Sequence, residues 1–244
     1  MSGHSKWANI KHKKGKTDAL KAKVTTKISR EITVAVRMGG ADPTGNMRLK
    51  LVLQKARENN IPKDNIKRAI DKGLGAGDAA AYEEMVYEGY GPNGVAVTVN
   101  VMTDNKNRAA ADVRHAFSKN GGSLGATGCV AWMFKSKGIF VIDAEDHDEE
   151  EVMMIALDAG AEDFKSEDGA FEIYTTPEGF DAVEAALADA GIETQVAKIS
   201  MVPDTYVELN GDDAEKMQKM LDALEDLDDV QDVFHNGLLP DDEE

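Results

Sequence analysis

Residues 139–199 carry an alternation of short apolar runs and amphipathic stretches that few folds accept. The pattern predicts, in order, strand 139–142, helix 148–159, strands 163–166 and 170–175, helix 177–190 and strand 193–199. This sequence of elements is that of the split βαβ, ferredoxin-like unit. We therefore expect the block to fold as one antiparallel sheet covered by two helices.

The residues on either side of this block predict a second α/β unit that the block interrupts. Before it come strands 85–90 and 95–102, joined by a Gly-Pro-Asn-Gly turn, then helix 107–120 and strand 129–134. After it come strand 206–209, helix 212–227 and strand 231–235. Joined, these pieces repeat the ferredoxin-like order. The predicted domains are therefore 79–134 plus 204–238, an inserted 135–203, and an acidic tail at 239–244.

The first 75 residues show helical periodicity only. Apolar residues recur every three to four positions from Thr17, and glycines divide the stretch. The predicted helices are 17–39, 42–59 and 62–73, and a basic arm precedes them, so that 1–75 forms an arm and a three-helix bundle. The glycine-rich residues 73–78 are a candidate hinge. The expected fold class is α+β multidomain, a helical bundle plus two ferredoxin-like α/β units.

Charge is divided unevenly between these regions. The whole chain has a net charge of −17, yet residues 1–75 contain 18 Lys and Arg against 6 Asp and Glu, a net of +12. The remaining residues carry a net of −29. A basic module joined to an acidic body is typical of proteins that meet a polyanion through one part only. The alternative is that the basic residues fold back onto the acidic body and neutralise it.

Basic side chains of the arm and bundle are the candidates for nucleic-acid binding, because Lys and Arg neutralise phosphates and release their counterions. Aromatic rings among them can stack on unpaired bases. The candidates are Lys6, Trp7, Lys11, His12, Lys13, Lys14, Lys16, Lys21, Lys23, Lys27, Arg30, Lys63, Lys67 and Arg68. Two alternatives stay open: Trp7 can anchor the arm to the bundle, and the lysines can form an ordinary solvated surface.

A second candidate is an anion site where helix 107–120 begins. Helix N-termini attract anions, and Asn105, Lys106, Asn107 and Arg108 surround this one. The alternative is a plain capping turn.

No arrangement of residues indicates an enzyme. The histidines lack metal-ligand spacing, and the single cysteine, Cys129, lies in an apolar context typical of a packed thiol. The glycine-rich residues 121–128 lack the Gly-Lys-Ser/Thr ending of a phosphate loop. We expect no catalytic residues, no cofactor and no metal. Because neither a signal peptide nor a run of about 20 apolar residues is present, we also expect a cytoplasmic protein with no membrane contact.

Five strings of residues, in order along nearly the whole chain, resemble the YebC/PmpR family. They are GHSKWANI at 3–10, GGADP at 39–43, YEGYGP at 87–92, TDNKNR at 103–108 and DDVQDVFHN at 228–236. Ser2 and Cys129 depart from the alanine and serine common in the family. The resemblance implies a cytoplasmic protein with an N-terminal helical domain and two α/β domains, and it implies no enzyme.

The resemblance also implies a regulator of gene expression. Some members are described as DNA-binding transcriptional regulators, mitochondrial relatives as translational activators, and bacterial relatives as ribosome-linked factors that relieve stalled synthesis. Two functions stay open: a DNA-binding transcriptional regulator, written first, and a translation factor bound to ribosomal or messenger RNA or to the ribosome. Charge does not separate them, because phosphate contacts carry no sequence information. A small-molecule sensor is a third reading, from fold analogy alone.

Overall fold

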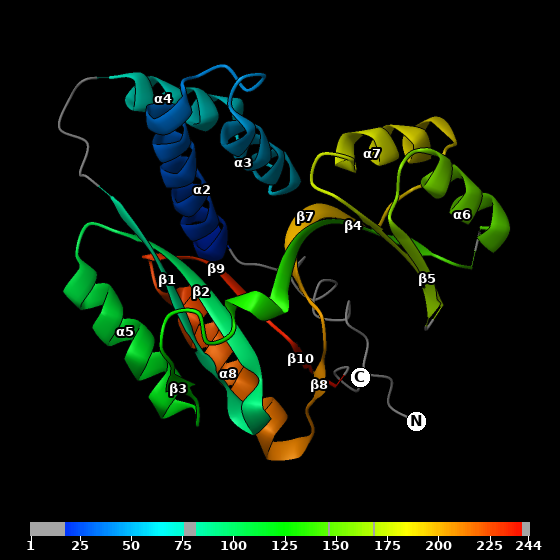
Figure 1. Cartoon of the computed structure of the whole chain (residues 1–244). Helices are drawn as coiled ribbons and strands as arrows, with labels where there is room; N and C mark the ends of the chain where they lie inside the picture. Colours follow the sequence, from blue (N-terminus) through cyan, green and yellow to red (C-terminus); the bar gives the residue numbers. More distant parts are fainter. Residues whose placement is uncertain (1–17, 76–81, 146, 168, 241–244) are drawn as a thin grey trace. The chain divides into compact units, whose positions relative to one another are not determined.

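The computed structural model describes residues 18–75, 82–145, 147–167 and 169–240, with side chains from residue 21 onward. These residues divide into two compact units, Trp132–Thr205 and the residues before and after it (Figure 1). Each unit contains one four-stranded antiparallel sheet. The expected α+β class, with two separate sheets and a helical bundle, is confirmed.

The unit Trp132–Thr205 is a ferredoxin-like sheet with two helices. Its elements are β4 (Phe134–Asp143), α6 (Glu149–Asp158), β5 (Asp163–Glu167), β6 (Ala170–Thr175), α7 (Phe180–Asp189) and β7 (Val196–Pro203). The strand order is β5-β6-β4-β7, and every neighbouring pair is antiparallel. Both helices lie on the same side of the sheet, where Phe140 stacks on Phe180 with a centroid distance of 4.6 Å (Figure 1).

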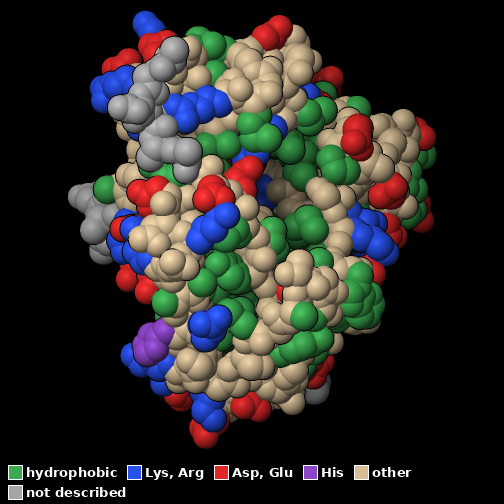
Figure 2. Space-filling view, turned by 60° about the vertical axis from the view of Figure 1, so that its left-hand side comes forward, with side chains coloured by type: hydrophobic (Ala, Val, Ile, Leu, Met, Phe, Trp, Pro, Cys, Tyr) green, Lys and Arg blue, Asp and Glu red, His purple; other side chains and the backbone are tan. Residues whose placement is uncertain are grey.

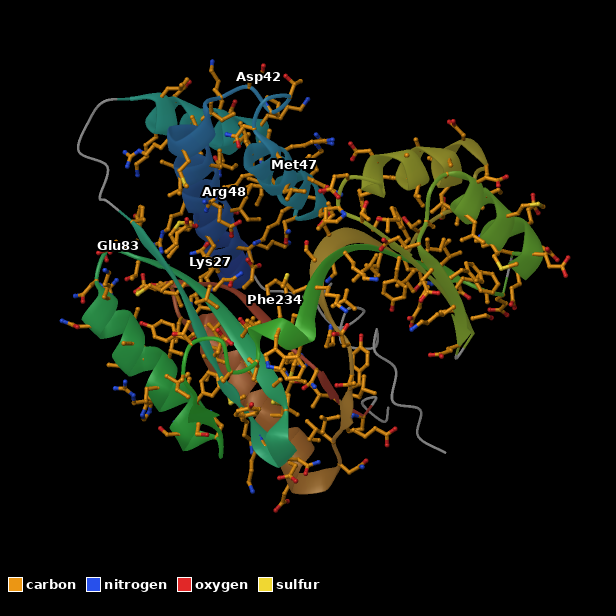
Figure 3. The ribbon with its side chains drawn as sticks, in the orientation of Figure 1. Lys27, Asp42, Met47, Arg48, Glu83 and Phe234 are labelled. Atoms are coloured by element: carbon orange, nitrogen blue, oxygen red, sulfur yellow. The ribbon has the colours of Figure 1, made fainter. Side chains whose placement is uncertain are left out.

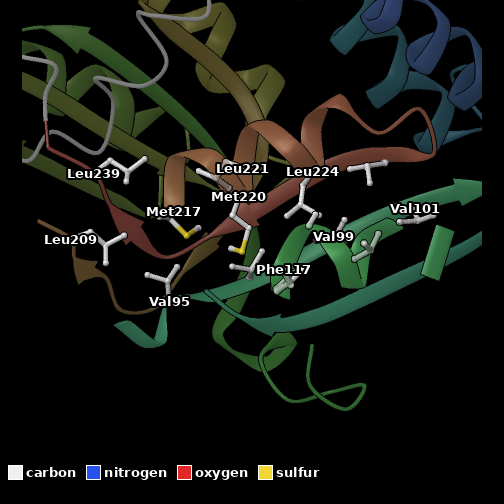
Figure 4. Packing of buried hydrophobic residues seen from close by; sticks show 14 of the residues in the cluster. Val95, Val99, Val101, Phe117, Leu209, Met217, Met220, Leu221, Leu224 and Leu239 are labelled. Atoms are coloured by element: carbon white, nitrogen blue, oxygen red, sulfur yellow. The ribbon is translucent and has the colours of Figure 1, made fainter. Parts of the chain in front are cut away.

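The second sheet belongs to the other unit and has the strand order β3-β1-β2-β9. Its elements are β1 (Glu83–Tyr90), β2 (Ala96–Thr103), α5 (Lys106–Lys119), β3 (Ser123–Leu124), α8 (Gly211–Asp226) and β9 (Val230–His235). Alternate valines of β2 form one cluster with Phe117 of α5 and with Met217 and Met220 of α8, all three fully buried (Figure 4). Alternate side chains of a strand point to one face, so both helices pack on the face that these valines occupy, although β2 is buried along nearly its whole length.

The predicted place of residues 206–209 in this sheet is wrong. The strand β8 (Val207–Glu208) pairs in parallel with β10 (Gly237–Leu238) in a separate two-stranded sheet. The position beside β2 is filled by β1, which pairs with β2 along its whole length. A short turn, Pro92–Gly94, joins these two strands, and the small loop makes their pairing entropically cheaper than pairing with a distant segment.

The predicted strand 129–134 is also wrong. Residues Ala131–Met133 form a 3-10 turn, and β4 begins only at Phe134. The buried Glu88 carboxylate accepts the N–H groups of Gly128 at 2.7 Å, Val130 at 2.9 Å and Ala131 at 2.7 Å. Burial opposes ionisation of Glu88, but these three donors outweigh it and hold its pKa below the ordinary value. The same N–H groups are therefore unavailable to a sheet partner.

The bundle consists of α2 (Asp18–Gly39), α3 (Met47–Glu58) and α4 (Lys63–Leu74), and α2 contacts both other helices. The predicted start of the second helix at residue 42 is wrong. Asn46 is the N-cap of α3: its side-chain oxygen accepts the Leu49 N–H, and its amide donates to the Ala35 carbonyl. Gly73, expected in the hinge, is buried within α4. Residues 76–78 of that hinge lie outside the described residues.

Candidate nucleic-acid interface

The residues predicted to bind nucleic acid fall into three groups. One group lies outside the described residues: Lys6, Trp7, Lys11, His12, Lys13, Lys14 and Lys16. The second lies on α2 and comprises Lys21, Lys23, Lys27 and Arg30. The third lies on α4 and comprises Lys63, Lys67 and Arg68. Lys21 is exposed near the start of α2, and the remaining cations of α2 and α4 differ in their partners.

Two lysines of α2 contact the acidic C-terminal end of α8. Lys23 Nζ pairs with Asp226 Oδ1 at 2.5 Å, and this hydrogen bond raises the pKa of Lys23 and lowers that of Asp226. Lys27 Nζ donates to the Glu225 carbonyl oxygen at 2.7 Å, while burial lowers the pKa of Lys27. Figure 3 shows Lys27 at the end of α2 that faces the sheet. In these two residues the basic bundle does fold back onto the acidic body.

Arg30 and Lys55 add further contacts between the bundle and the acidic residues in and just before β9. Arg30 Nη1 lies 3.5 Å from Asp229 Oδ1. Lys55 Nζ of α3 donates to Glu31 and to Asp232, each at 2.8 Å. Desolvation opposes the charge on Lys55, but the two carboxylates outweigh it and raise its pKa. Burial raises the pKa of Glu31.

The contacts that join the bundle to the α/β domain of its unit are polar. The apolar cluster of the bundle is formed by α2, α3, α4 and the residue Ile61. The cluster of the α/β domain is formed by its strands, α5, α8 and adjoining segments. Among the described residues, no apolar cluster has members from both. We call the contacts of Lys23, Lys27, Arg30 and Lys55 with α8 and β9 the polar joint.

The cations of α4 differ because no acid of the described chain pairs with them. Lys63, Lys67, Arg68 and Lys72 are all exposed, and none forms a side-chain hydrogen bond or ion pair with a described residue. We call these four residues the α4 cations. Figure 2 shows acidic and basic side chains interspersed on the face in view.

A groove of about 340 Å³ runs between α2 and α4. We call it the α2/α4 groove. Three cations line it, Arg30, Arg68 and Lys72, and no carboxylate of the described chain does so. Apart from Ala69, the other lining residues each carry a hydroxyl or an amide group: Thr25, Thr26, Ser29, Thr33, Asn65 and Tyr82. Cations beside hydroxyl and amide groups make a surface suited to an anion that also carries hydrogen-bonding groups.

The walls of the groove are held by close contacts between α2 and α4. A Cβ atom on Gly73 would lie 2.7 Å from Val36 Cβ, so only glycine permits this approach. Thr33 Oγ1 donates to the Ala69 carbonyl at 3.1 Å. At the edge of the groove, the Arg30 guanidinium lies 4.6 Å from the Tyr82 ring centroid.

The predicted anion site at the start of α5 has its cations paired within the protein. Asn105 caps the helix, and its side-chain oxygen accepts the Arg108 N–H at 3.1 Å. The Arg108 guanidinium donates to two carboxylates, each at 2.8 Å, one of which is Asp229. Lys106 pairs with a carboxylate of β1, and Asn107 is exposed. The arrangement is that of a capping turn.

Sequence reasoning did not single out Ser29, Lys72 or Tyr82, which meet only when α4 packs against α2. One signal was present, because Thr25, Ser29 and Thr33 recur at a spacing of four and so share one side of a helix. Within the described chain, no group of three or more His, Cys, Asp and Glu is arranged to hold a metal ion. Of the described helices, none combines the length and the apolar character needed to cross a membrane.

The fold defines a class of α+β proteins in which a basic helical bundle accompanies two four-stranded antiparallel sheets, each covered by helices. A family described as the TACO1/YebC protein N-terminal domain matches residues 5–76, and one described as the TACO1/YebC second and third domain matches residues 82–237. The chain belongs to the TACO1/YebC family, which confirms the resemblance drawn from its sequence strings.

Relatives match this chain from end to end. A protein of Desulforamulus reducens named "Probable transcriptional regulatory protein" is 58% identical over 238 residues, which cover 97% of this chain and 98% of that protein. One of the same name from Clostridium tetani is 56% identical over 245 residues, covering all of both chains. The crystal structure of a conserved hypothetical protein from Aquifex aeolicus matches with a TM-score of 0.79 and 44% identity, covering 97% of this chain and 98% of that one.

Proposed function

We propose that this protein is a non-enzymatic regulator of gene expression that binds nucleic acid, DNA in the first place, through its basic N-terminal region. The observation that carries the proposal is the set of α4 cations, which are exposed and have no acidic partner among the described residues of a chain whose net charge is −17. The names of the D. reducens and C. tetani relatives support transcription as the process.

A cation that is already paired within the protein is less available to bind a phosphate. Lys23, Lys27 and Arg30 are engaged in the polar joint, so we assign them a smaller part in binding. The α4 cations and the lysines of the arm carry the larger part. Each phosphate that they neutralise releases counterions, so that the logarithm of affinity falls with the logarithm of salt concentration, by about 0.9 per phosphate for duplex DNA.

The helix α4 also has a suitable form for this task. It is 12 residues long, its inner side packs on α2 through Ala69 and Gly73, and its outer side is exposed. The major groove of DNA admits one α-helix, and Asn65 and Arg68 are residue types that hydrogen-bond to base edges. The acidic remainder of the chain repels a polyanion, which confines contact to the basic region.

The test is crosslinking of the tagged protein in cells, with bound DNA and bound RNA recovered in parallel and sequenced. Discrete promoter sites in the DNA fraction are the expected result. Contacts concentrated on ribosomal RNA, with none at promoters, would overturn DNA as the polymer and favour a ribosome-bound translation factor. Recovery of neither polymer would overturn nucleic-acid binding altogether.

A charge-reversed arm serves as the internal comparison in the same experiment. Replacing Lys11, Lys13, Lys14 and Lys16 with glutamate changes the charge of the arm and no apolar residue. We expect the crosslinks to be lost while the variant stays folded, as shown by circular dichroism. A matched variant with Arg114→Glu, Lys119→Glu, Lys216→Glu and Lys219→Glu on α5 and α8 reverses four exposed cations outside the basic region and is expected to keep its crosslinks.

A further inference from the structure

The α2/α4 groove presents unused hydrogen-bond donors from one helix and available acceptors from the other. On α4, Arg68, Lys72 and Asn65 make no side-chain hydrogen bond with a described residue. Arg68 and Lys72 are four residues apart, so they lie one above the other on the same side of the helix. Two adjacent cations on one wall can hold a single phosphate group between them.

The opposite wall is a row of hydroxyl groups on α2. Thr25 Oγ1 donates to the Lys21 carbonyl at 2.8 Å, and Thr33 Oγ1 donates to the Ala69 carbonyl at 3.1 Å. Because their protons are used within the bundle, these oxygens offer lone pairs to a ligand. The hydroxyl of Ser29, between them, makes no hydrogen bond with a described residue and can donate or accept. The wall thus suits sugar hydroxyls and base N–H groups.

The size of the groove limits what fits. Its volume of about 340 Å³ is at the lower end of the roughly 300–1,000 Å³ that small-ligand sites occupy. One nucleotide is of this size, whereas a double helix lies across a surface and does not enter such a space. A strand reaches the groove only where a nucleotide is unpaired, at an end, in a loop or flipped out of a duplex.

We propose that the α2/α4 groove binds one phosphorylated nucleoside unit, with its phosphate between Arg68 and Lys72 and its sugar and base along the hydroxyl row of α2. The proposal rests on the nucleic-acid function above and deepens it, because it names the part of the polymer that the bundle holds. A free mononucleotide and an unpaired nucleotide within a strand share this chemistry.

The experiment is calorimetric titration of the full-length protein with adenosine 5′-monophosphate, adenosine and inorganic phosphate. Two double variants are compared: Arg68→Gln with Lys72→Gln, inside the groove, and Lys63→Gln with Lys67→Gln, on the same helix outside its lining. Both remove two positive charges from α4, so net charge is matched. Thermal melts by circular dichroism establish that both variants fold.

We expect the mononucleotide to bind the wild type at least about tenfold more tightly than adenosine does, because only the former brings the phosphate. Its affinity should fall about tenfold or more in the groove variant, since two charge-assisted hydrogen bonds are lost, and change by less than about twofold in the control. Equal losses in the two variants would overturn the proposal, because the effect would then be one of net charge. So would inorganic phosphate binding as tightly as the mononucleotide.

A labelled single strand of about ten nucleotides separates the two sources of the ligand. If it displaces the mononucleotide, the groove takes a nucleotide within a strand; if it does not, the ligand is a free nucleotide. Mononucleotide binding in the groove with no binding of any polymer would support the groove and defeat the proposed function. Polymer binding that depends on Lys63 and Lys67, with no mononucleotide binding, would support the function and defeat the groove.

Discussion

Helices α2 and α4 are both rich in positive charge, yet their cations differ in almost every other respect. Lys23 and Arg30 of α2 reach the acidic end of α8 and the turn before β9, where Asp226 and Asp229 pair with them. The α4 cations are exposed and have no partner among the described residues. The comparison shows that a basic sequence does not by itself define a binding surface, because the fold decides which charges remain available to another molecule.

The largest effect on DNA affinity is expected from reversing the charge of two α4 cations. We expect Lys63→Glu with Lys67→Glu to lower affinity for labelled duplex DNA by about 100-fold at low salt, because two phosphate contacts become repulsive. Stability should change by less than about 0.5 kcal/mol, since both side chains are exposed. Fluorescence anisotropy and urea unfolding measure the two effects. The matched reversal of Lys216 and Lys219 is the control, and an equal loss of affinity in it would contradict the assignment.

Removing Lys55 should act on stability instead. Lys55→Met leaves Glu31 buried without its cation, which we expect to cost about 2 kcal/mol of unfolding free energy. The cost is below that of a fully buried pair because 30% of the Lys55 side chain is exposed. Urea unfolding measures it, and Arg57→Met, on the same helix but exposed, is the control. Adding Glu31→Gln should recover part of the loss; no recovery would show that the pair is not the cause.

The two buried carboxylates Glu88 and Glu31 should respond to pH with opposite signs. The pKa of Glu88 is lowered, so its stabilising effect is complete above the ordinary value of 4.5 and is lost as pH falls through its folded-state pKa. Glu88→Gln should therefore cost about 1.5 kcal/mol at neutral pH and less in acid. The pKa of Glu31 is raised by burial, so its ionisation weakens the fold as pH rises above 4.5.

Urea unfolding of the wild type and of each single glutamine variant, at neutral and acid pH, checks both signs. A Glu88→Gln deficit that stays constant with pH would show that the carboxylate charge is not what the loop at Gly128 requires.

The smallest effect is expected from loosening the polar joint. Asp226→Asn removes the carboxylate that pairs with Lys23, so this lysine becomes available to phosphate. We expect affinity for DNA to rise by about twofold and the salt dependence to steepen, because one more counterion is released. Asp212→Asn at the other end of α8 makes the same change in net charge and is the control. If both variants gain equally, the joint does not withhold Lys23 from the ligand.

Most of the fold follows from local patterns in the sequence. Helical periodicity marks α2 and α4 almost to their ends, and the order of elements in the inserted unit predicts its strand order. The errors have different causes. At Ala131 a side chain distant in sequence, Glu88, takes over the backbone N–H groups, and nothing in the sequence near 129–134 indicates this contact. At the start of α3 the signal was local, because Asn46 and Asp42 are both residue types that cap a helix and the structure uses Asn46.

The candidate site was less predictable than the fold. The basic residue types are visible in the sequence, but pairing of Lys23 with Asp226 spans 203 residues and depends on where α8 ends. The groove was equally hard to predict, because Ser29 and Lys72 line one space only when α2 and α4 pack closely at Gly73. A charge count gives the total, while the fold determines its distribution.

The insertion of one unit within the other has a consequence for synthesis of the chain. Translation delivers β1 and β2 first, then the whole of Trp132–Thr205, and only afterwards α8 and β9. The inserted unit can therefore fold while the outer sheet still lacks its last strand, and β2 stays an open edge until Val230–His235 arrives to pair with it. During that interval the nascent protein exposes a valine-rich strand, so slow elongation through residues 132–229 lengthens the period in which it is prone to aggregate.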